Sequence, residues 1–443
     1  MSFPQYLNYK PSPIECAPSV PAHWAISKLK RVMEFRTGWT PPTGRDDYYR
    51  GPNPWVTIGD MRSKYLEVTE KQISDEAARV ARMSPVPKGS LLFSFKLSIG
   101  QVSFAGCELY TNEAIASFSP DGSLNLGYCY YAFPIFVSAN AAENIYGAKL
   151  LNQQLIGDAT ILIPSISEQQ EIARFLDNET GKIDELIAEQ ERLIELLKEK
   201  RQAVISQAVT KGLNPDAPMK PSGVEWLGDV PEHWNTTRLV FLATKIGSGK
   251  TPLGGALVYE SSGVIFIRSQ NVYDDGIRLD DVSFISDEID SEMSATRVLS
   301  WDVLLNITGA SIGRCALVPK EFLAANVNQH VCILRFGDSC VARWVHACLC
   351  SNAAKEQIRS LQTGSGREGL NFSQVGAIRV TMPPDKEIES ILNYLGKEMH
   401  RIDSALADME NSRILLRERR SALISAAVTG QIDVRGFAEQ SAA

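Results

Sequence analysis

An internal repeat constrains the fold of this chain more than any other feature of its sequence. Residues 10–24 (KPSPIECAPSVPAHW) and 220–234 (KPSGVEWLGDVPEHW) agree at 8 of 15 positions without a gap, where ordinary residue frequencies give about one match. Residues 164–214 and 383–433 agree at 19 of 51 positions, again without a gap. Matches at a long offset mark a duplicated structural unit. The sequence therefore predicts a pseudo-twofold internal repeat in the order module, helix, module, helix.

The longer of the two matching stretches has the pattern of a coiled-coil helix. Apolar side chains recur at seven-residue intervals in both copies, with charged residues between them. These side chains are Leu176, Ile183, Leu197 and Val204 in the first copy, and Leu395, Ile402, Met409, Leu416 and Leu423 in the second. Gln190 occupies one of the seven-residue positions in the first copy. It is either a polar residue that sets the register of the coiled coil or a solvated Gln at a frayed edge. Prolines precede each predicted helix, and a Thr-Lys-Gly or Thr-Gly sequence marks its end.

A helix of this length needs a partner for its apolar stripe. About 40 residues of α-helix extend over roughly 60 Å. We expect the two helices to pair antiparallel as the chain folds back with its modules at opposite ends. The alternative is that each helix packs on its own module as an ordinary amphipathic helix. The helices match without a gap, whereas the modules match only in patches. Since a spacer must keep its length and a recognition surface can vary, these are the roles we predict.

The predicted fold class is α+β, with two mixed α/β modules and two long helices that form an antiparallel coiled coil. Short β-rich runs separated by turns favour this class; they lie at 54–61, 90–95 and 159–164, and at 263–272, 302–309 and 377–382. The predicted segments are a first module at 1–163, a central coiled-coil helix at 164–214, a second module at 215–382, a C-terminal coiled-coil helix at 383–433 and a tail at 434–443.

Composition limits the cellular setting and the kind of partner. No apolar run reaches the length of a membrane span, and the first residues lack the apolar core of a signal peptide, so we expect a cytoplasmic protein. The eight cysteines include no C-x-x-C pair, which favours reduced, buried thiols over a zinc site. The net charge is −7, whereas DNA-binding proteins are often basic. Contact with DNA would therefore need local basic patches or a second subunit.

Catalytic motifs are missing from the sequence. Residues 246–251 (IGSGKT) resemble the end of a phosphate-binding loop, but residue 244 is Thr instead of Gly and Pro252 follows, so we interpret them as a turn. No H-E-x-x-H motif and no closely spaced carboxylate cluster stands out. His23 and His233 lie in the repeated V-P-x-H-W sequence, and we interpret that sequence as a packed corner beside each module. We predict no catalytic residue and no metal ligand.

Polar side chains on the predicted loops have the chemistry that reads DNA, because they can bond to base edges and phosphates. The candidates are Thr40, Thr57, Lys96, Ser98, Lys149 and Asn152 in the first module, and Lys250, Thr251, Arg268, Gln270, Asn271, Thr308, Ser311, Arg314, Arg367 and Asn371 in the second. Any one of them alone is more often a solvated surface side chain. The hypothesis of a DNA-binding surface therefore depends on the set.

The repeated order of motifs resembles the specificity subunit of type I restriction–modification enzymes, over nearly the whole chain. The likeness lies in V-P-x-H-W, in the turns Gly38–Pro41 and Gly249–Pro252, in Ser-Ile-Gly at 98–100 and 311–313, and in the helix start I-P-S-I-S-E-Q-Q-E-I at 163–172. The second helix start, M-P-P-D-K-E-I-E-S-I, departs from the pattern because it lacks the Gln.

The resemblance implies a non-catalytic subunit with two target-recognition domains, each reading one half of a bipartite, asymmetric double-stranded DNA site. The paired helices would fix the spacer and dock two modification (adenine methyltransferase) subunits, and two restriction (translocase and nuclease) subunits would join them. S-adenosylmethionine, ATP and Mg would belong to those partners, with no cofactor in this chain. Two alternatives remain: a coiled-coil scaffold with two protein-binding modules, and a duplicated enzyme, which the missing catalytic motifs disfavour.

Overall fold

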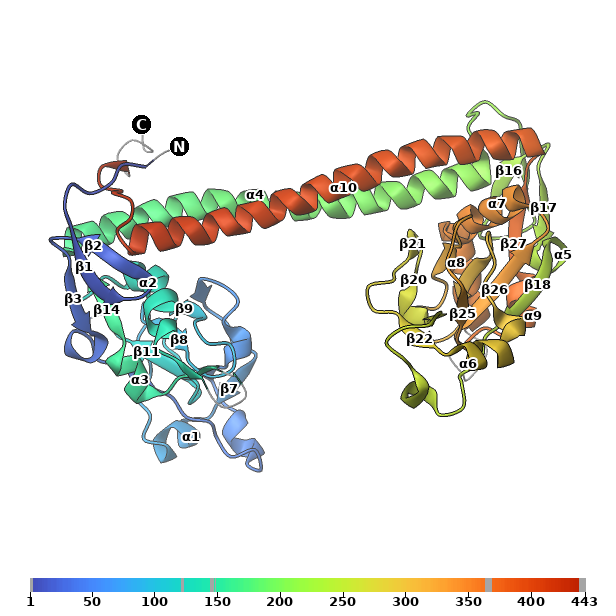
Figure 1. The fold of residues 1–443 in the computed structure, drawn as a ribbon. Helices are drawn as coiled ribbons and strands as arrows, with labels where there is room; N and C mark the ends of the chain where they lie inside the picture. Colours follow the sequence, from blue (N-terminus) through green and yellow to red (C-terminus); the bar gives the residue numbers. More distant parts are fainter. Residues whose placement is uncertain (1–2, 121–122, 144–146, 148, 363–368, 438–443) are drawn as a thin grey trace. The chain divides into compact units, whose positions relative to one another are not determined.

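The computed structural model describes residues 3–120, 123–143, 147, 149–362 and 369–437. The chain forms two compact units, one made of Met1–Gln190 with Ser412–Ala443 and the other of Glu191–Asn411 (Figure 1). Each unit contains a mixed α/β body and a part of two long helices, α4 (Ile166–Lys211) and α10 (Asp385–Val428). Across the described residues, the structure has no helix of the length and apolar character that crossing a bilayer needs.

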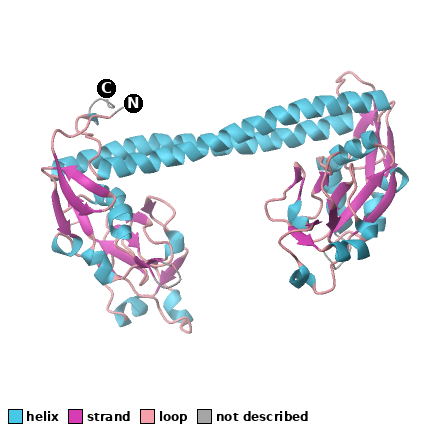
Figure 2. Cartoon of the chain, in the orientation of Figure 1, coloured by secondary structure: helices cyan, strands magenta, loops and turns pink. Residues whose placement is uncertain are grey.

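A five-stranded sheet of order β4-β11-β8-β9-β6 lies at the centre of the first unit (Figure 2). Its strands are β4 (Arg36–Thr37), β11 (Ile115–Phe118), β8 (Leu91–Ser94), β9 (Val102–Ala105) and β6 (Tyr65–Leu66). A three-stranded sheet adds β10 (Tyr110–Thr111), β5 (Asn53–Val56) and β7 (Lys71–Ile73); the strand pairs are β1 (Tyr9–Ile14) with β2 (Ala17–Pro21), β3 (Ala25–Lys28) with β14 (Thr160–Ile163), and β12 (Ala142–Glu143) with β13 (Lys149–Leu150). The short helices are α1 (Asp75–Val80), α2 (Leu126–Ala139) and α3 (Gln153–Asp158).

Strand β8 is buried on both faces, and this explains its run of apolar residues from Leu91 to Phe93. Leu91 and Phe93 belong to the cluster that packs against α2, whereas Leu92 belongs to a second cluster on the opposite face. Successive side chains of a strand alternate between faces, so a sheet covered on both sides needs apolar residues at every position. On the α2 side, the rings of Phe118 and Phe133 meet edge to face with centroids 4.9 Å apart.

The second unit contains a four-stranded sheet of order β18-β26-β23-β24 and a three-stranded sheet of order β22-β19-β25. The strands are β18 (Ala243–Ser248), β26 (Val331–Phe336), β23 (Val303–Asn306), β24 (Cys315–Leu317), β22 (Ser283–Ile285), β19 (Val264–Ile267) and β25 (Ala325–Val327); the strand pairs are β15 (Met219–Pro221) with β16 (Asp229–Pro231), β17 (Asn235–Arg238) with β27 (Arg379–Met382), and β20 (Val272–Tyr273) with β21 (Gly276–Ile277). The short helices are α5 (Leu239–Leu242), α6 (Asp287–Glu292), α7 (Ser339–Leu349), α8 (Asn352–Gln362) and α9 (Phe372–Ala377). Trp344 and Val345 of α7 pack in one cluster with Leu305 and Leu334 of the larger sheet.

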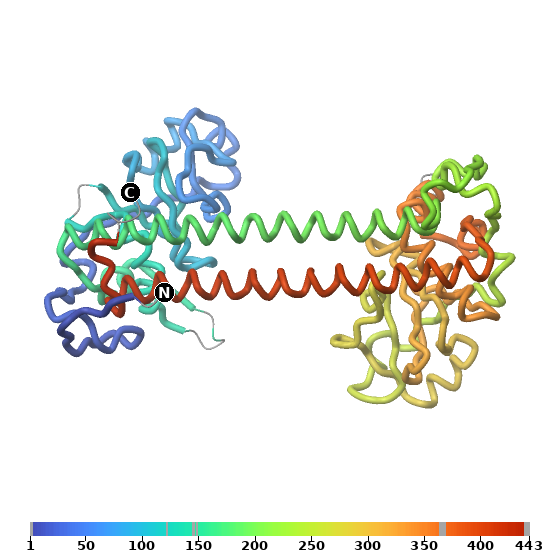
Figure 3. Tube along the Cα trace, turned by 90° about the horizontal axis from the view of Figure 1, so that it is seen from above, coloured from blue at the N-terminus to red at the C-terminus, as the bar shows by residue number. Residues whose placement is uncertain are grey.

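The long helices α4 and α10 run antiparallel within each unit (Figure 3). In the first unit Leu176 packs in one cluster with Val428, and eight residues later on α4, Asp184 accepts hydrogen bonds from Arg420 at 2.8 and 3.1 Å. In the second unit Arg201 lies 3.3 Å from Asp403, and further along α4 Val209 shares a cluster with Ile388. Later residues of α4 thus meet earlier residues of α10.

The nine apolar residues predicted at seven-residue intervals along the two long helices are all buried or half-buried. Leu176, Ile183, Leu395 and Ile402 are buried, and Leu197, Val204, Met409, Leu416 and Leu423 are half-buried. Glycines with left-handed backbone follow both helices, Gly212 at φ 74° and Gly430 at φ 72°. The predicted pairing of the two long helices is confirmed, because the apolar stripes meet each other within each unit.

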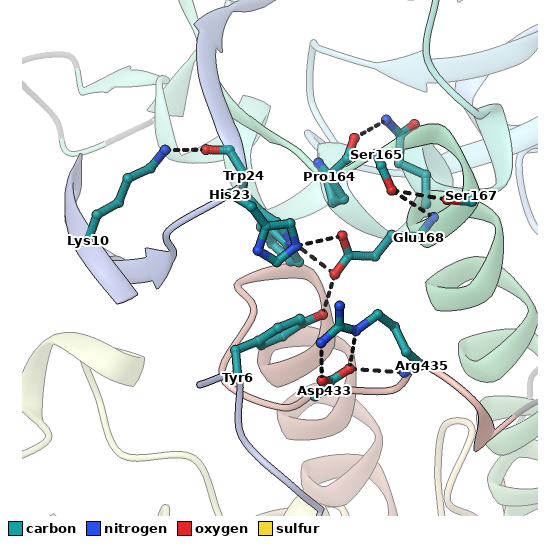
Figure 4. Close-up of polar contacts among 11 residues, drawn as sticks. Tyr6, Lys10, His23, Trp24, Pro164, Ser165, Ser167, Glu168, Asp433 and Arg435 are labelled. Atoms are coloured by element: carbon teal, nitrogen blue, oxygen red, sulfur yellow. Dashed lines mark hydrogen bonds and ion pairs between the residues drawn. The ribbon is translucent and has the colours of Figure 1, made fainter. Parts of the chain in front are cut away.

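The first V-P-x-H-W sequence forms a joint between the body of its unit and both long helices (Figure 4). Trp24 is fully buried and donates its Nε1–H to Glu168 at 3.0 Å, while His23 Nε2 lies 3.0 Å from the other carboxylate oxygen. Tyr6 donates its hydroxyl to the same carboxylate at 2.7 Å. Glu168 lies in the first turn of α4. A Cβ on Gly430, after the last turn of α10, would lie 3.1 Å from the Trp24 ring.

The second copy of the sequence forms a matching joint in the second unit. His233 Nε2 lies 2.8 Å from Glu387 in the first turn of α10. The buried ring of Trp234 would lie 3.1 Å from a Cβ on Gly212, directly after α4. Each joint thus contacts the start of one long helix and the end of the other. The interpretation of V-P-x-H-W as a packed corner is confirmed.

Candidate nucleic-acid interface

The Gly-x-Thr-Pro turn lies against a neighbouring strand in both units. A Cβ added to Gly38 would lie 1.7 Å from the carbonyl oxygen of Thr111, and one added to Gly249 would lie 1.6 Å from that of Val327. Only glycine permits such a close backbone approach. The glycines therefore hold both turns in one place, with the threonine two residues later directed at the residues that follow the strand.

In the first unit, the turn presents its threonine to Glu113. The Thr40 hydroxyl donates to the Glu113 carboxylate, and Lys96 Nζ lies 4.0 Å from the other oxygen. Burial acts to raise the pKa of Glu113, but the hydrogen bond from Thr40, a backbone hydrogen bond and the charge of Lys96 outweigh it and hold that pKa below its usual range. Lys96, Glu113 and Asn152 line one surface hollow. Thr40 and Lys96 are thus brought together around a carboxylate, and Asn152, whose side chain caps α3, lines the same hollow.

In the second unit, the turn presents its threonine to an amide. The Thr251 hydroxyl donates to Gln329 Oε1, and Gln329 Nε2 lies 2.9 Å from His330 Nε2. The other ring nitrogen of His330 shares a hydrogen bond with the Thr308 hydroxyl. Lys250 is exposed beside Thr251. The structure therefore gathers the predicted residues Lys250, Thr251 and Thr308 around Gln329 and His330.

Three other predicted residues stabilise a turn in the second unit. Gln270 donates to the Asp281 carboxylate at 2.8 Å, and Arg268 donates to the Asp281 carbonyl at 3.2 Å. Asn271 is only 2 % exposed, and its amide donates to the carbonyls of Arg278 and Asp281. The Asn271 side chain is therefore buried, and its amide is already bonded within the turn.

Two arginine side chains lie beside the ring of Tyr273 in the second unit. The guanidinium groups of Arg314 and Arg278 each lie 4.9 Å from the centre of the Tyr273 ring. Arg314 is exposed, whereas the neighbouring Ser311 hydroxyl accepts a hydrogen bond from Asn306 at 3.1 Å. A guanidinium group beside an aromatic ring keeps N–H donors that suit phosphate, and of the two arginines Arg278 also donates to the Asp275 carboxylate at 2.7 Å.

The remaining predicted residues are spread over each unit. Thr57 caps a short turn and bonds to Asp60 at 2.7 Å, and Asn371 caps α9. Ser98 and Lys149 are exposed, in the loop after β8 and in β13. Arg367 lies outside the described residues. These positions neither support nor oppose a role in binding.

Sequence reasoning missed Glu113, Gln329 and Tyr273. A repeated signal could have identified the first two, since both follow an asparagine directly after a strand. Asn112 Oδ1 accepts from the Ala114 amide, and Asn328 Oδ1 accepts from the His330 amide, both at 3.1 Å. The asparagine turns the chain back and exposes the next side chain to the threonine of the Gly-x-Thr-Pro turn.

Comparison with known proteins gives consistent matches. The family model described as the type I restriction modification DNA specificity domain matches residues 21–196. The MjaIX specificity subunit of Methanocaldococcus jannaschii is 24% identical over 94% of this chain and 95% of its own length. The EcoBI specificity subunit of Escherichia coli is 26% identical over 71% and 67%.

Two solved structures share the fold. One, from work on complex assembly and conformational transition of the type I R-M system, has a TM-score of 0.67 and 12% identity, covering 92% of this chain and 98% of that one. The other, the HsdS subunit from Thermoanaerobacter tengcongensis, has a TM-score of 0.50 and 14% identity, covering 95% and 100%. The likeness extends over both units and both long helices.

Proposed function

The chain belongs to the family of type I restriction–modification specificity subunits, and from this premise we propose how it recognises DNA. It is the non-catalytic subunit that recognises DNA and assembles the complex, and catalysis lies in its partners. A protein-binding scaffold is not favoured, because the relatives that match along most of this chain are specificity subunits.

We propose that each unit is a target-recognition domain that reads one half of a bipartite, asymmetric site. One observation carries this proposal: the same glycine-anchored turn presents Glu113 in the first unit and Gln329 in the second. A carboxylate only accepts hydrogen bonds, whereas an amide both donates and accepts. The two turns therefore favour different base edges, a carboxylate the amino group of cytosine and an amide the paired donor and acceptor of adenine.

The paired helices set the spacer between the half-sites in this proposal, and they dock two modification and two restriction subunits. S-adenosylmethionine, ATP and Mg belong to those partners. Exposed apolar side chains on the long helices support docking, since Leu186 is 53% exposed and Leu415 is 64% exposed. Exposed apolar side chains mark a surface that another protein covers where they form a contiguous patch. The proposal places the complex in the cytoplasm with its DNA.

A DNA-binding measurement tests the function. We expect the full chain with its modification subunit to bind one DNA sequence selectively, with an affinity that falls as salt rises, because each phosphate contact releases counterions. The experiment compares this complex with the chain alone and the modification subunit alone, by titrating labelled duplexes at several salt concentrations. Binding without sequence selectivity in all three samples would favour a scaffold instead.

Exchanging the two acceptors is expected to change base preference in one half-site at a time. Glu113→Gln should alter one position in the half-site read by the first unit, and Gln329→Glu one position in the other, each by about 1–3 kcal/mol. Selection from duplexes randomised in either half-site measures both. Glu15→Gln, which makes the same charge change in the turn after β1, is the control and should leave both preferences unchanged. A loss of affinity without altered preference would exclude base contact.

A further inference from the structure

Two cysteines and a histidine come together inside the second unit, among the residues that the structure describes. Cys315 begins β24, His346 lies on α7, and Cys350 directly follows that helix. Their ligand atoms all lie within 4.8 Å of one another. The two Sγ atoms are 3.5 Å apart, and Cys350 Sγ lies 3.6 Å from His346 Nε2. Both cysteines are buried and His346 is half-buried.

We propose that these three residues bind one zinc ion. Around a tetrahedral zinc with Zn–S near 2.3 Å and Zn–N near 2.0 Å, two sulfurs are about 3.8 Å apart and a sulfur and a nitrogen about 3.5 Å apart. The Cys315–Cys350 and Cys350–His346 separations come within a few tenths of an ångström of these values. Two thiolates also neutralise the charge of Zn²⁺, so the bound site can stay buried, and such soft ligands disfavour Mg²⁺ or Ca²⁺.

The fourth coordination position faces a cleft of about 180 Å³ that Asp274, His346 and Cys350 help to line. Water can take this position. Asp274 is held in place, since its Oδ1 accepts from the Cys315 amide and from Lys355 Nζ, both at 2.9 Å. Such outer contacts orient the ligands of metal sites. The cleft also gives the ion a route to the buried thiols.

The bound zinc would connect the edge strand β24 to the end of α7. Cys315 follows Arg314, and Asp274 follows Tyr273. The ion would therefore lie directly behind the Arg314 guanidinium and the Tyr273 ring. His346 and Cys350 are four residues apart and share one helix face. The sequence contains no C-x-x-C pair, so its cysteine spacing did not predict this site. The ligand Cys315 comes from a strand that is distant in sequence from His346 and Cys350. The zinc site does not depend on the DNA-binding proposal.

Metal content of the purified full-length chain tests the site. We expect about one zinc ion per chain and a melting temperature that falls when a chelator removes it and recovers with zinc. Cys315→Ser and Cys350→Ser should weaken zinc binding by more than the roughly 10- to 100-fold that loss of an outer contact costs. Cys348→Ser is the matched control: Cys348 is equally buried on α7, but it lies 3.8 Å from Thr381 and outside the cluster.

Cobalt substitution keeps the test valid if a serine variant fails to fold. Cobalt(II) in the unmodified chain should give the strong visible bands of tetrahedral coordination and thiolate charge-transfer bands in the near ultraviolet. Zinc should displace both sets of bands. A chain that takes up neither metal, or a Cys348→Ser variant that loses zinc as completely as Cys315→Ser, would overturn the proposal.

Discussion

Removing one heptad from each long helix should shorten the preferred DNA spacer by about three base pairs, since seven helical residues span about 10.5 Å and B-DNA rises about 3.4 Å per base pair. The deletions must match. Asp184 pairs with Arg420 and Arg201 with Asp403, so residues 184–190 of α4 face 414–420 of α10. Removing both segments keeps the heptad phase on each helix and preserves the seam.

Selection from duplexes with spacers of every length measures this prediction. The half-site sequences should stay unchanged, while affinity for the original site should fall towards the level of non-specific binding, about 10³-fold or more. Deleting 184–190 alone is the contrasting variant, because it leaves α10 without its partner residues and should abolish specific binding at every spacer. An unchanged optimum after the matched deletion would show that the helices do not determine the spacing.

Trp24→Ala is expected to cost about 3–5 kcal/mol of unfolding free energy, the usual range for truncating a buried Trp. The ring fills the joint against Gly430 and satisfies one oxygen of the Glu168 side chain, which is only 4% exposed. Truncation therefore leaves a cavity and also removes a donor from a buried carboxylate. The start of α4 and the end of α10 in the first unit both lose their contact with Trp24. We therefore expect binding to DNA to fall as well.

Denaturant unfolding of three variants separates packing from hydrogen bonding at this joint. Trp24→Phe keeps most of the ring volume but loses the N–H donor, so it should cost about 1–3 kcal/mol. Trp226→Ala is the control, because Trp226 is 38% exposed and outside the buried clusters. The joint would have no special role if Trp24→Ala destabilised the chain no more than Trp226→Ala does.

Local patterns in the sequence were sufficient to predict the helices and the joints. Heptad spacing identified Leu176, Ile183, Leu395 and Ile402, and all four are buried. Their periodicity is a property of the helix itself, so no knowledge of distant residues is needed. The repeated V-P-x-H-W sequence likewise predicted a packed corner. Its partner Glu168 could be named only from the structure, because Glu168 lies 145 residues beyond His23.

The sequence alone determined the α+β class and the two apolar stripes, since both follow from short-range spacing and composition. Tertiary structure decided which polar residues meet. Asn271 appeared suited to base contact but is buried in a turn, while Glu113 and Gln329 were missed although each meets a predicted threonine. The cysteine cluster unites β24 with α7 in the same way. Such sets depend on strand order and turn geometry, where small backbone differences decide whether a polar side chain faces solvent or a partner.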